Sequence, residues 1–202
     1  TYLSVTATAA LAGVAGCQGG GGGTEDDGTT DDGDGTSVAD WRTWIPASLV
    51  VGTDAEALML DTNRAKAELP TETYAQFQIG GIAEGLGIEE SSIDRMTGVQ
   101  RAQGGSDIVL TGSYDPSGII DTLDVADSDV GTYRGYQVVD GQFAAGSDAL
   151  MVASNYETLI DTHAGREPYL GANDADWNRL MTSIQGATLG VATSGTVGDN
   201  ST

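Results

Sequence analysis

The distribution of apolar and polar positions divides the chain into distinct stretches. Residues 3–15 form an apolar, alanine-rich run. The stretch after it contains glycine, aspartate and threonine but no large apolar residue, so it cannot bury enough surface to offset the entropy of ordering. Large apolar residues return at Trp41 and recur almost to the end of the chain. The pattern predicts a flexible spacer at 17–37, a single folded domain at 38–194 and a flexible tail at 195–202.

Within this domain, apolar spacing and turn residues predict a mixture of strands and helices. A short strand is expected at 48–51. Asp54 is then expected to cap a long helix that Pro70 ends. The other expected elements are a helix at 71–86, weakened by Gly80-Gly81; a strand pair at 92–103 and 107–113, joined through Gly104-Gly105; a strand at 133–139 that turns at Asp140-Gly141 into 142–145; a helix at 174–184; and a last strand at 187–193.

A repeat is visible in the second half of the chain. Gly105-Ser106-Asp107 precedes an apolar strand and a helix ending in Asp121-Thr122, and Gly146-Ser147-Asp148 precedes a similar strand and a helix ending in Asp161-Thr162. This similarity indicates a duplicated strand–helix unit, although two ordinary segments can resemble one another by chance. From Asp107 on, the predicted order is the split βαβ order of ferredoxin-like folds. We therefore expect an α+β fold, with an antiparallel sheet and helices mainly on one face.

The charge composition narrows the environment and the partners. The formal net charge is −22, from 30 acidic against 8 basic residues, and Lys66 is the one lysine. Such an excess destabilises a folded chain by self-repulsion in dilute salt. At molar salt the screening length falls to about 3 Å, which removes most of this penalty. The composition favours a protein of concentrated salt over an ordinary acidic protein, and it disfavours nucleic acid and anionic membrane surfaces as partners.

The chain's one cysteine lies at a processing motif. Val14-Ala15-Gly16-Cys17 closes the apolar run and precedes the glycine-rich spacer. That run matches the apolar core of a signal peptide and is shorter than the ~20 residues that a membrane-spanning helix needs. The motif predicts a signal peptide at 1–16 and a lipid on Cys17. The alternative, a buried apolar segment with a chance cysteine, is disfavoured because the spacer cannot pack.

The first 17 residues resemble a known type of export signal. Thr1-Tyr2-Leu3-Ser4, the alanine-rich run and Val14-Ala15-Gly16-Cys17 resemble the end of a twin-arginine-type lipoprotein signal of halophilic archaea. The resemblance implies export in the folded state and anchoring to the outer face of the cell membrane through a lipid on Cys17. One lipid chain anchors only marginally, so a two-chain anchor is expected.

Few residues in the sequence are candidates for catalysis, metal binding or ligand binding. His163, the one histidine, is expected at a helix end, where a charged imidazole suits the helix dipole. No zinc site, nucleophile elbow or phosphate loop is recognisable. An acidic loop with Asp124, Asp127 and Asp129 is more typical of a solvated surface than of a cation site. Six aromatic residues suggest either core or a ligand groove: Tyr114, Tyr133, Tyr136, Tyr156, Tyr169 and Trp177.

The sequence therefore favours a non-enzymatic, lipid-anchored domain that binds a partner protein or a small solute at the cell surface. We assign no catalytic residue, metal or cofactor. A secreted hydrolase with a carboxylate pair and a structural cell-envelope component are the alternatives. Asn200-Ser201-Thr202 also fits the pattern for N-glycosylation, which marks Asn200 as a candidate modification site.

Overall fold

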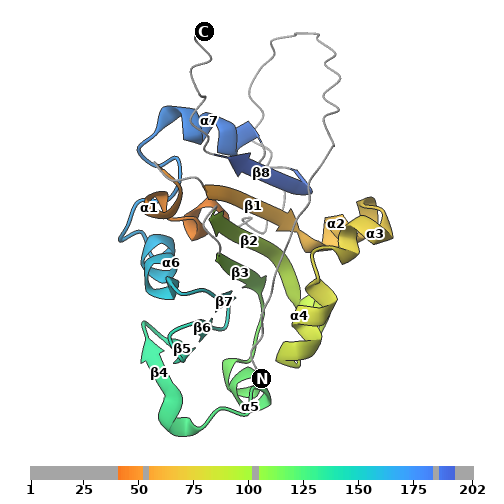
Figure 1. Cartoon of the computed structure of the whole chain (residues 1–202), viewed down its shortest axis with the longest axis vertical. Coiled ribbons are helices and arrows are strands. Elements are labelled where there is room, and N and C mark those ends of the chain that lie inside the picture. The colour runs from red at the N-terminus through yellow and green to blue at the C-terminus, as the bar shows by residue number, and fades with distance from the viewer. Residues whose placement is uncertain (1–40, 52–54, 102–104, 184–186, 194–202) are drawn as a thin grey trace, which may run out of the picture. The chain divides into compact units, whose positions relative to one another are not determined.

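An eight-stranded antiparallel sheet forms the centre of the computed structural model, which describes residues 41–51, 55–101, 105–183 and 187–193 (Figure 1). Its order is β4-β5-β6-β7-β3-β2-β1-β8. The strands are β1 (Ala55–Asp61), β2 (Ile93–Arg101), β3 (Ser106–Gly112), β4 (Val130–Tyr133), β5 (Tyr136–Val139), β6 (Phe143–Ala145), β7 (Ala149–Val152) and β8 (Leu189–Thr193). The signal, spacer and tail, with Cys17 and Asn200, lie outside the described residues.

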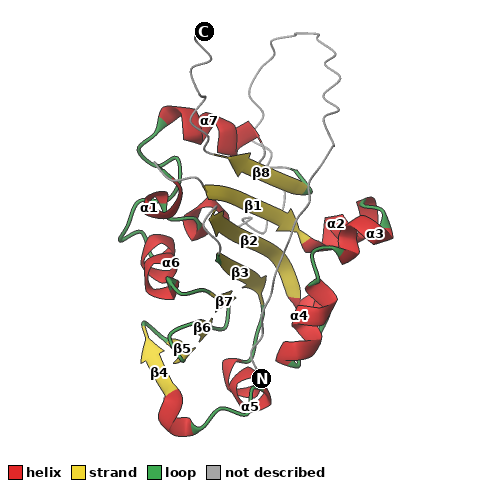
Figure 2. Cartoon of the chain, viewed as in Figure 1, coloured by secondary structure: helices red, strands yellow, loops and turns green. Residues whose placement is uncertain are grey.

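Short helices connect and cover these strands (Figure 2). The α-helices are α1 (Ala47–Val50), α2 (Thr62–Glu68), α3 (Thr71–Ala75), α4 (Ile79–Leu86), α5 (Pro116–Thr122), α6 (Tyr156–His163) and α7 (Ala175–Ser183). The 3-10 helices are η1 (Trp41–Trp44), η2 (Glu90–Ser92) and η3 (Asp127–Asp129). The predicted α+β class with an antiparallel sheet is confirmed.

The ferredoxin-like order is not confirmed. In that order, one strand separates the two strands joined by the first helix. Here α5 connects β3 to β4, and β5, β6 and β7 all lie between them. The strands from β4 to β7 follow one another as hairpins, so they carry β4 to the edge of the sheet. The last strand, β8, pairs with β1 at the opposite edge.

The strand predicted at 48–51 was wrong, and the helix predicted up to Pro70 was correct only in its second half. Residues 47–50 form α1 rather than a strand, and the expected helix at 55–69 is strand β1 followed by helix α2. The sequence of β1 is rich in good helix formers, but the strand lies between β2 and β8 and pairs with both. Pairing and burial override the local preference. The cap of α2 is Asp61, whose Oδ1 accepts from the backbone N–H of Arg64 at 3.0 Å.

Several of the later predicted elements are confirmed, and two others are each divided into two. The β2–β3 pair, α7 and β8 form where the pattern placed them. The helix expected at 71–86 is divided into α3 and α4 at Gln78, which has a φ of 55°. The strand expected at 133–139 is divided by a turn at Arg134-Gly135, so β4 and β5 form a hairpin. Asp140-Gly141 makes the next turn as predicted.

The repeat predicts its elements correctly but not their arrangement. The copies form β3 with α5 and β7 with α6, and β3 pairs with β7. Helix α6 packs Leu159 and Ile160 on the face that carries Val109 and Met151. Helix α5 lies on the other face, because Ser117 Oγ accepts from Gln137 Nε2 at 3.2 Å and Gln137 alternates with the core residue Val138. Helix α5 is therefore an exception to the expectation that helices lie mainly on one face.

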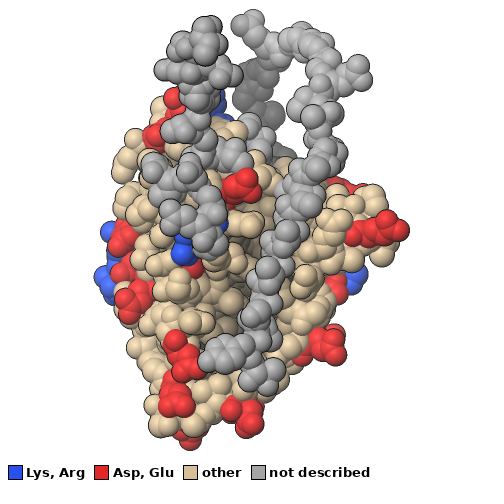
Figure 3. Space-filling view, viewed as in Figure 1, with Lys and Arg blue, Asp and Glu red and all other residues tan. Residues whose placement is uncertain are grey.

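Acidic groups are spread over the surface of the described residues. Figure 3 shows them scattered over the visible face, with only a few basic groups among them. All of Asp124, Asp127 and Asp129 are exposed, as expected of a solvated acidic loop. This distribution agrees with the net charge and leaves the acids hydrated.

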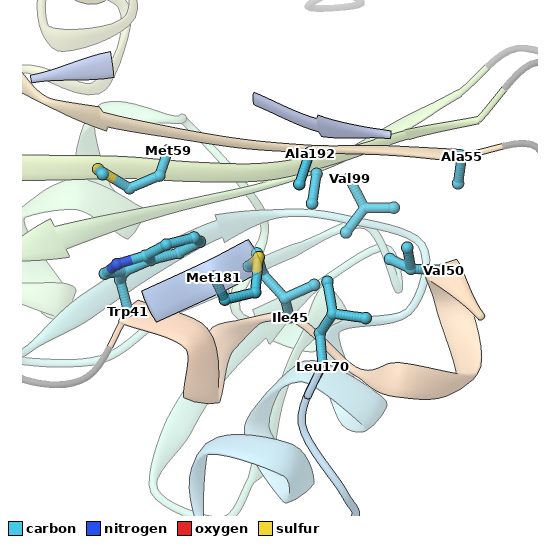
Figure 4. Close-up of a cluster of buried hydrophobic side chains, with 10 residues drawn as sticks. Trp41, Ile45, Val50, Ala55, Met59, Val99, Leu170, Met181 and Ala192 are labelled. Atoms are coloured by element: carbon cyan, nitrogen blue, oxygen red, sulfur yellow. The ribbon is translucent and has the colours of Figure 1, made fainter. Parts of the chain in front are cut away.

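The apolar core on the α6 face has two clusters. One packs η1, α1 and α7 on the sheet through Trp41, Ile45, Val50, Ala55, Ala57, Met59, Val99, Leu170, Met181 and Ala192 (Figure 4). The other surrounds Trp44, Val109, Met151, Leu159 and Ile160. Trp41 of η1 belongs to the first cluster and Trp44 belongs to the second, so this short segment joins the two parts of the core.

Candidate functional site

The β4–β5 hairpin presents an unusual residue at its tip. Its two-residue turn is Arg134-Gly135, with φ values of 49° and 90°. A turn with two positive φ values favours asparagine, aspartate or glycine. The neighbouring turn at Asp140-Gly141 follows that preference, with φ values of 50° and 64°. Arginine in this conformation is uncommon, so its side-chain contacts must hold it there.

Those contacts converge on Asp161 of helix α6. Tyr133 donates its hydroxyl hydrogen bond to Asp161 Oδ2 at 2.9 Å, and Arg134 Nη2 donates to the same oxygen at 3.3 Å. Arg134 Nε also forms an ion pair with Asp161 Oδ1. The guanidinium carbon lies 5.2 Å from the centroid of the Tyr133 ring, within the range of a cation–π contact. One carboxylate thus ties the hairpin tip to α6.

Aromatic side chains surround this tie. The rings of Tyr133 and Tyr156 meet edge to face, with centroids 6.0 Å apart. Tyr136 packs with them against the core cluster around Trp44. All three tyrosines are half-buried and Arg134 is exposed. We refer to Tyr133, Arg134, Tyr136, Tyr156 and Asp161 as the hairpin–α6 surface.

The electrostatics of this surface fix its protonation states. Removal from water raises the pKa of Asp161, but hydrogen bonds from Arg134 and Tyr133 and the charges of Arg134 and Arg166 lower it more. The pKa of this carboxyl therefore lies below its usual value. Burial raises the pKa of Tyr136 and of Tyr156, and nearby Asp148 and Glu157 add to these shifts. Near neutral pH the carboxyl group of Asp161 is therefore ionised, and the phenols of Tyr136 and Tyr156 are neutral.

A second aromatic contact lies at the end of α6. The rings of His163 and Trp44 are stacked, with centroids 3.8 Å apart and planes within 8°. Thr43 Oγ1 lies 2.8 Å from His163 Nδ1, a hydrogen-bond distance. Burial lowers the pKa of His163, although the charge of Asp148 partly opposes this. His163 ends α6 as predicted, but it is neutral at pH 7 rather than the charged group expected there.

A buried carboxylate fixes the start of α6. Asp107, at 1% exposure, lies in β3. Its Oδ1 accepts from the backbone N–H of Ser154, and its Oδ2 accepts from Asn155 Nδ2, each at 3.1 Å. It also forms an ion pair with Arg101 of β2. These partners satisfy the buried charge and set the position of α6 relative to β2 and β3.

A similar carboxylate cluster lies elsewhere on the molecule. Glu90 Oε1 accepts from Lys66 Nζ at 2.8 Å and from the hydroxyl of Tyr74 at 2.9 Å. These hydrogen bonds lower the pKa of Glu90. Burial, with the hydrogen bond and charge of Glu90, raises the pKa of Tyr74 to about 12. This cluster likewise joins a phenol, a carboxylate and a cation, here an ammonium group, but it connects helical segments rather than a strand hairpin.

The structure brings together three of the six aromatic residues singled out in the sequence. Tyr133, Tyr136 and Tyr156 meet on the hairpin–α6 surface. Tyr114 is buried near Gly112, Tyr169 lies 5.8 Å from the guanidinium carbon of Arg42, and Trp177 packs on the other core cluster. In the described part of the chain, no group of three or more His, Cys, Asp or Glu residues is placed to hold a metal ion. None of the described helices has the length and apolar character needed to cross a bilayer.

Sequence reasoning missed Arg134 and the role of Asp161. Arg134 was read as part of a continuous strand, although the glycine that follows it is a turn signal. Asp161 was noticed only as a member of the repeat. No local pattern links these residues, because the contact depends on the hairpin folding back onto α6.

Comparison with known proteins adds little. No protein-family model matches the chain, and no curated protein matches it. The crystal structure of TP0453 in crystal form I is similar with a TM-score of 0.39 and 11% identity, over 71% of this chain and 59% of that chain. The chain thus spans less than two thirds of that protein's length. A likeness of this size carries no argument about function.

Proposed function

We propose that the protein is a non-enzymatic binding domain, held at the outer face of a halophile's cell membrane by a lipid on Cys17, and that it binds a partner protein through the hairpin–α6 surface. One observation carries the binding surface: half-buried Tyr133, Tyr136 and Tyr156 lie together with exposed Arg134. Tyrosine and arginine are enriched at protein interfaces and at their energetic centres.

The chemistry of the surface supports binding over proton transfer. A general acid made from a carboxyl group needs a raised pKa. The described carboxyl groups with clear shifts, Glu68, Glu90 and Asp161, are all shifted downward. The phenols of Tyr136 and Tyr156 are shifted away from neutral pH as well. Fixed donors and acceptors of this kind suit recognition, and they do not favour the alternative of a carboxylate hydrolase.

The geometry also gives the surface a defined shape before a partner arrives. Tyr133 and Arg134 are both held on Asp161, and Tyr156 is held against Tyr133. Side chains that are already ordered lose less entropy on binding. The Cys17 tether and the acidic, salt-tolerant surface belong to this proposal as inferences from the sequence.

Site-specific photo-crosslinking in cells tests the proposal. A photoreactive phenylalanine analogue in place of Tyr156 should give a discrete adduct with a second protein, and the same analogue in place of Tyr74 should give none. Tyr74 is the matched control because it is also a half-buried tyrosine whose hydroxyl donates to a glutamate, Glu90, as the hydroxyl of Tyr156 donates to Glu157.

Two further variants separate the parts of the proposal. Arg134→Ala should remove the Tyr156 adduct, because the tip of the hairpin would lose its hold on α6. Cys17→Ser should remove membrane association and the adduct together. An adduct from Tyr74 as strong as that from Tyr156 would contradict the binding surface. A lipid-free chain in the cytoplasm of wild-type cells would contradict the tether.

A further inference from the structure

Strand β4 leaves one side of the sheet open among the described residues. It pairs with β5 through four residue pairs, from Val130↔Val139 to Tyr133↔Tyr136, without a register shift. The sheet order ends at β4, and Figure 1 shows this strand at the outer edge. Natural proteins protect such edges with very short strands, proline, lysine, inward charges or bulges. Residues 130–133 form a short strand but contain no proline, lysine, other charge or bulge, and Gly131 and Thr132 are exposed.

The hairpin determines which backbone groups are available at this edge. Tyr133 and Tyr136 flank a two-residue turn, so their N–H and C=O groups face one another. Alternate residues along an antiparallel strand direct these groups to opposite sides. The N–H and C=O groups of Val130 and Thr132 therefore point away from β5. They form a short, regular template for another strand.

We propose that β4 pairs antiparallel with β4 of a second copy of this chain, about a two-fold axis at Gly131. In such a pair, a residue whose N–H and C=O groups point away from β5 must lie opposite a residue of the partner whose groups also point away from its own β5. Centring the axis on Gly131 places Val130 opposite the partner's Thr132, and Thr132 opposite the partner's Val130. The two sheets then form one continuous sheet across the axis. This self-association is separate from the binding role proposed above.

Charge complementarity favours an antiparallel pair with a second copy of this chain. The two-fold axis brings the partner's Arg134, at the tip of its hairpin, beside the start of β4, where the 3-10 helix η3 carries Asp127 and Asp129, and the same contact forms a second time by symmetry. Opposite charges that lie close together attract one another. Asp127, Asp129 and Arg134 are all exposed. Arg134 already contacts Asp161, but a guanidinium has five N–H donors and can serve both.

The glycine at the axis leaves room for the two backbones. Residues facing one another there have Cα atoms about 4.5 Å apart. A Cβ on Gly131 would meet nothing nearer than the Val138 carbonyl oxygen at 3.9 Å. The contact is smaller than that of a permanent dimer. The dimer therefore forms at high protein concentration and in concentrated salt, where repulsion between copies of net charge −22 is screened.

Disulfide trapping of the full chain tests the register. In a Cys17→Ser background, Gly131→Cys should oxidise to a covalent dimer several-fold faster than Thr132→Cys in molar salt, judged by non-reducing electrophoresis. The Gly131 Cα separation suits a disulfide, whereas the two Thr132 residues lie diagonally, about 7–8 Å apart. Equal rates, or faster dimerisation of Thr132→Cys, would overturn the proposal.

Sedimentation of the Cys17→Ser chain tests the pairing without an introduced thiol. The dimer fraction should rise with protein concentration in molar salt. Thr132→Pro should lower it, because proline removes an outward N–H and leaves the hydrogen bonds to β5 in place. A monomer at every concentration up to the millimolar range, or a dimer unaffected by Thr132→Pro, would also overturn the proposal. Circular dichroism confirms that each variant is folded.

Discussion

The two halves of the sheet are stabilised in different ways. Strands β1, β2 and β3 have 7, 9 and 7 residues. Buried side chains of β1 and β2 pack under η1, α1 and α7, and Val109 of β3 packs in the cluster around Trp44. Strands β4 to β7 have only 3 or 4 residues each. Their ends are held by side-chain hydrogen bonds, such as Tyr133 to Asp161 and Tyr136 to Asp148. Burial stabilises the long strands and also reaches β5, β6 and β7, whereas polar contacts position β4 at the edge of the sheet.

The difference explains where a binding surface can arise. Strand β4 has no fully buried residue, so polar contacts must determine its place. Those contacts also order the aromatic and charged groups around them. The same residues thus hold the hairpin in place and form the hairpin–α6 surface. The open edge at β4 belongs to this half as well.

Loss of Asp107 should have the largest effect, because this carboxylate joins the two halves. It binds Arg101 on β2 and both Ser154 and Asn155 before α6. Asp107→Ala leaves these donors without their acceptor and should lower the free energy of unfolding by about 3 kcal/mol, the lower part of the range for breaking a buried pair. Denaturant unfolding in molar salt measures it.

The matched variant Asp107→Asn keeps the side-chain shape and one acceptor oxygen, so it should cost less than Asp107→Ala. A loss below about 1 kcal/mol for Asp107→Ala, the size of one ordinary hydrogen bond, would show that the halves do not depend on this junction.

Arg134→Asn should have a smaller and local effect. Asparagine suits the left-handed turn better than arginine does, but it cannot reach Asp161 as the guanidinium does. We expect several-fold faster amide hydrogen exchange in β4 and β5 and no change in β2 and β3. The control is Lys66→Gln, which removes the ion pair between Lys66 and Glu90. That ion pair does not hold a hairpin in place. Faster exchange across all strands in Arg134→Asn would contradict the separation of the two halves.

The contrast between the halves also explains which features could be predicted from the sequence. The β2–β3 pair and α7 have clear periodicity and lie close along the chain, so their patterns are sufficient. Strand β1 was taken for a helix, because its alanine- and leucine-rich sequence becomes a strand only through pairing with distant β2 and β8.

The hairpin–α6 surface could be predicted only in part. Its tyrosines were recognised as a possible group, since aromatic residues stand out in this composition. Their pairing with Arg134 and Asp161 could not be predicted, because residues 27 or 28 positions apart meet only after the chain folds back. Likewise, the stack of Trp44 on His163 joins η1 to the end of α6, across most of the domain's sequence.

The smallest expected effect is the pH dependence of folding stability that arises from His163, at the contact between η1 and α6. Burial lowers its pKa from the ordinary 6.5, and the opposing charge of Asp148, from the turn before β7, does not restore it. The folded chain therefore binds this proton less readily than the unfolded chain does. Stability should rise with pH through about 6.5, and it should fall as the pH is lowered through that value.

The variant His163→Phe keeps a flat ring against Trp44 and removes the titrating nitrogens. Its melting temperature should vary less between pH 7.5 and 5.5 than that of the wild type, and binding through the hairpin–α6 surface should be unchanged. A series of thermal melts in molar salt, with pH as the variable, measures the difference. An identical pH dependence in both chains would mean that other groups cause it. A melting temperature that rises more in the wild type than in His163→Phe as pH falls through 6.5 would show that the folded state favours the charged imidazole, and so that the Trp44 stack stabilises a cation.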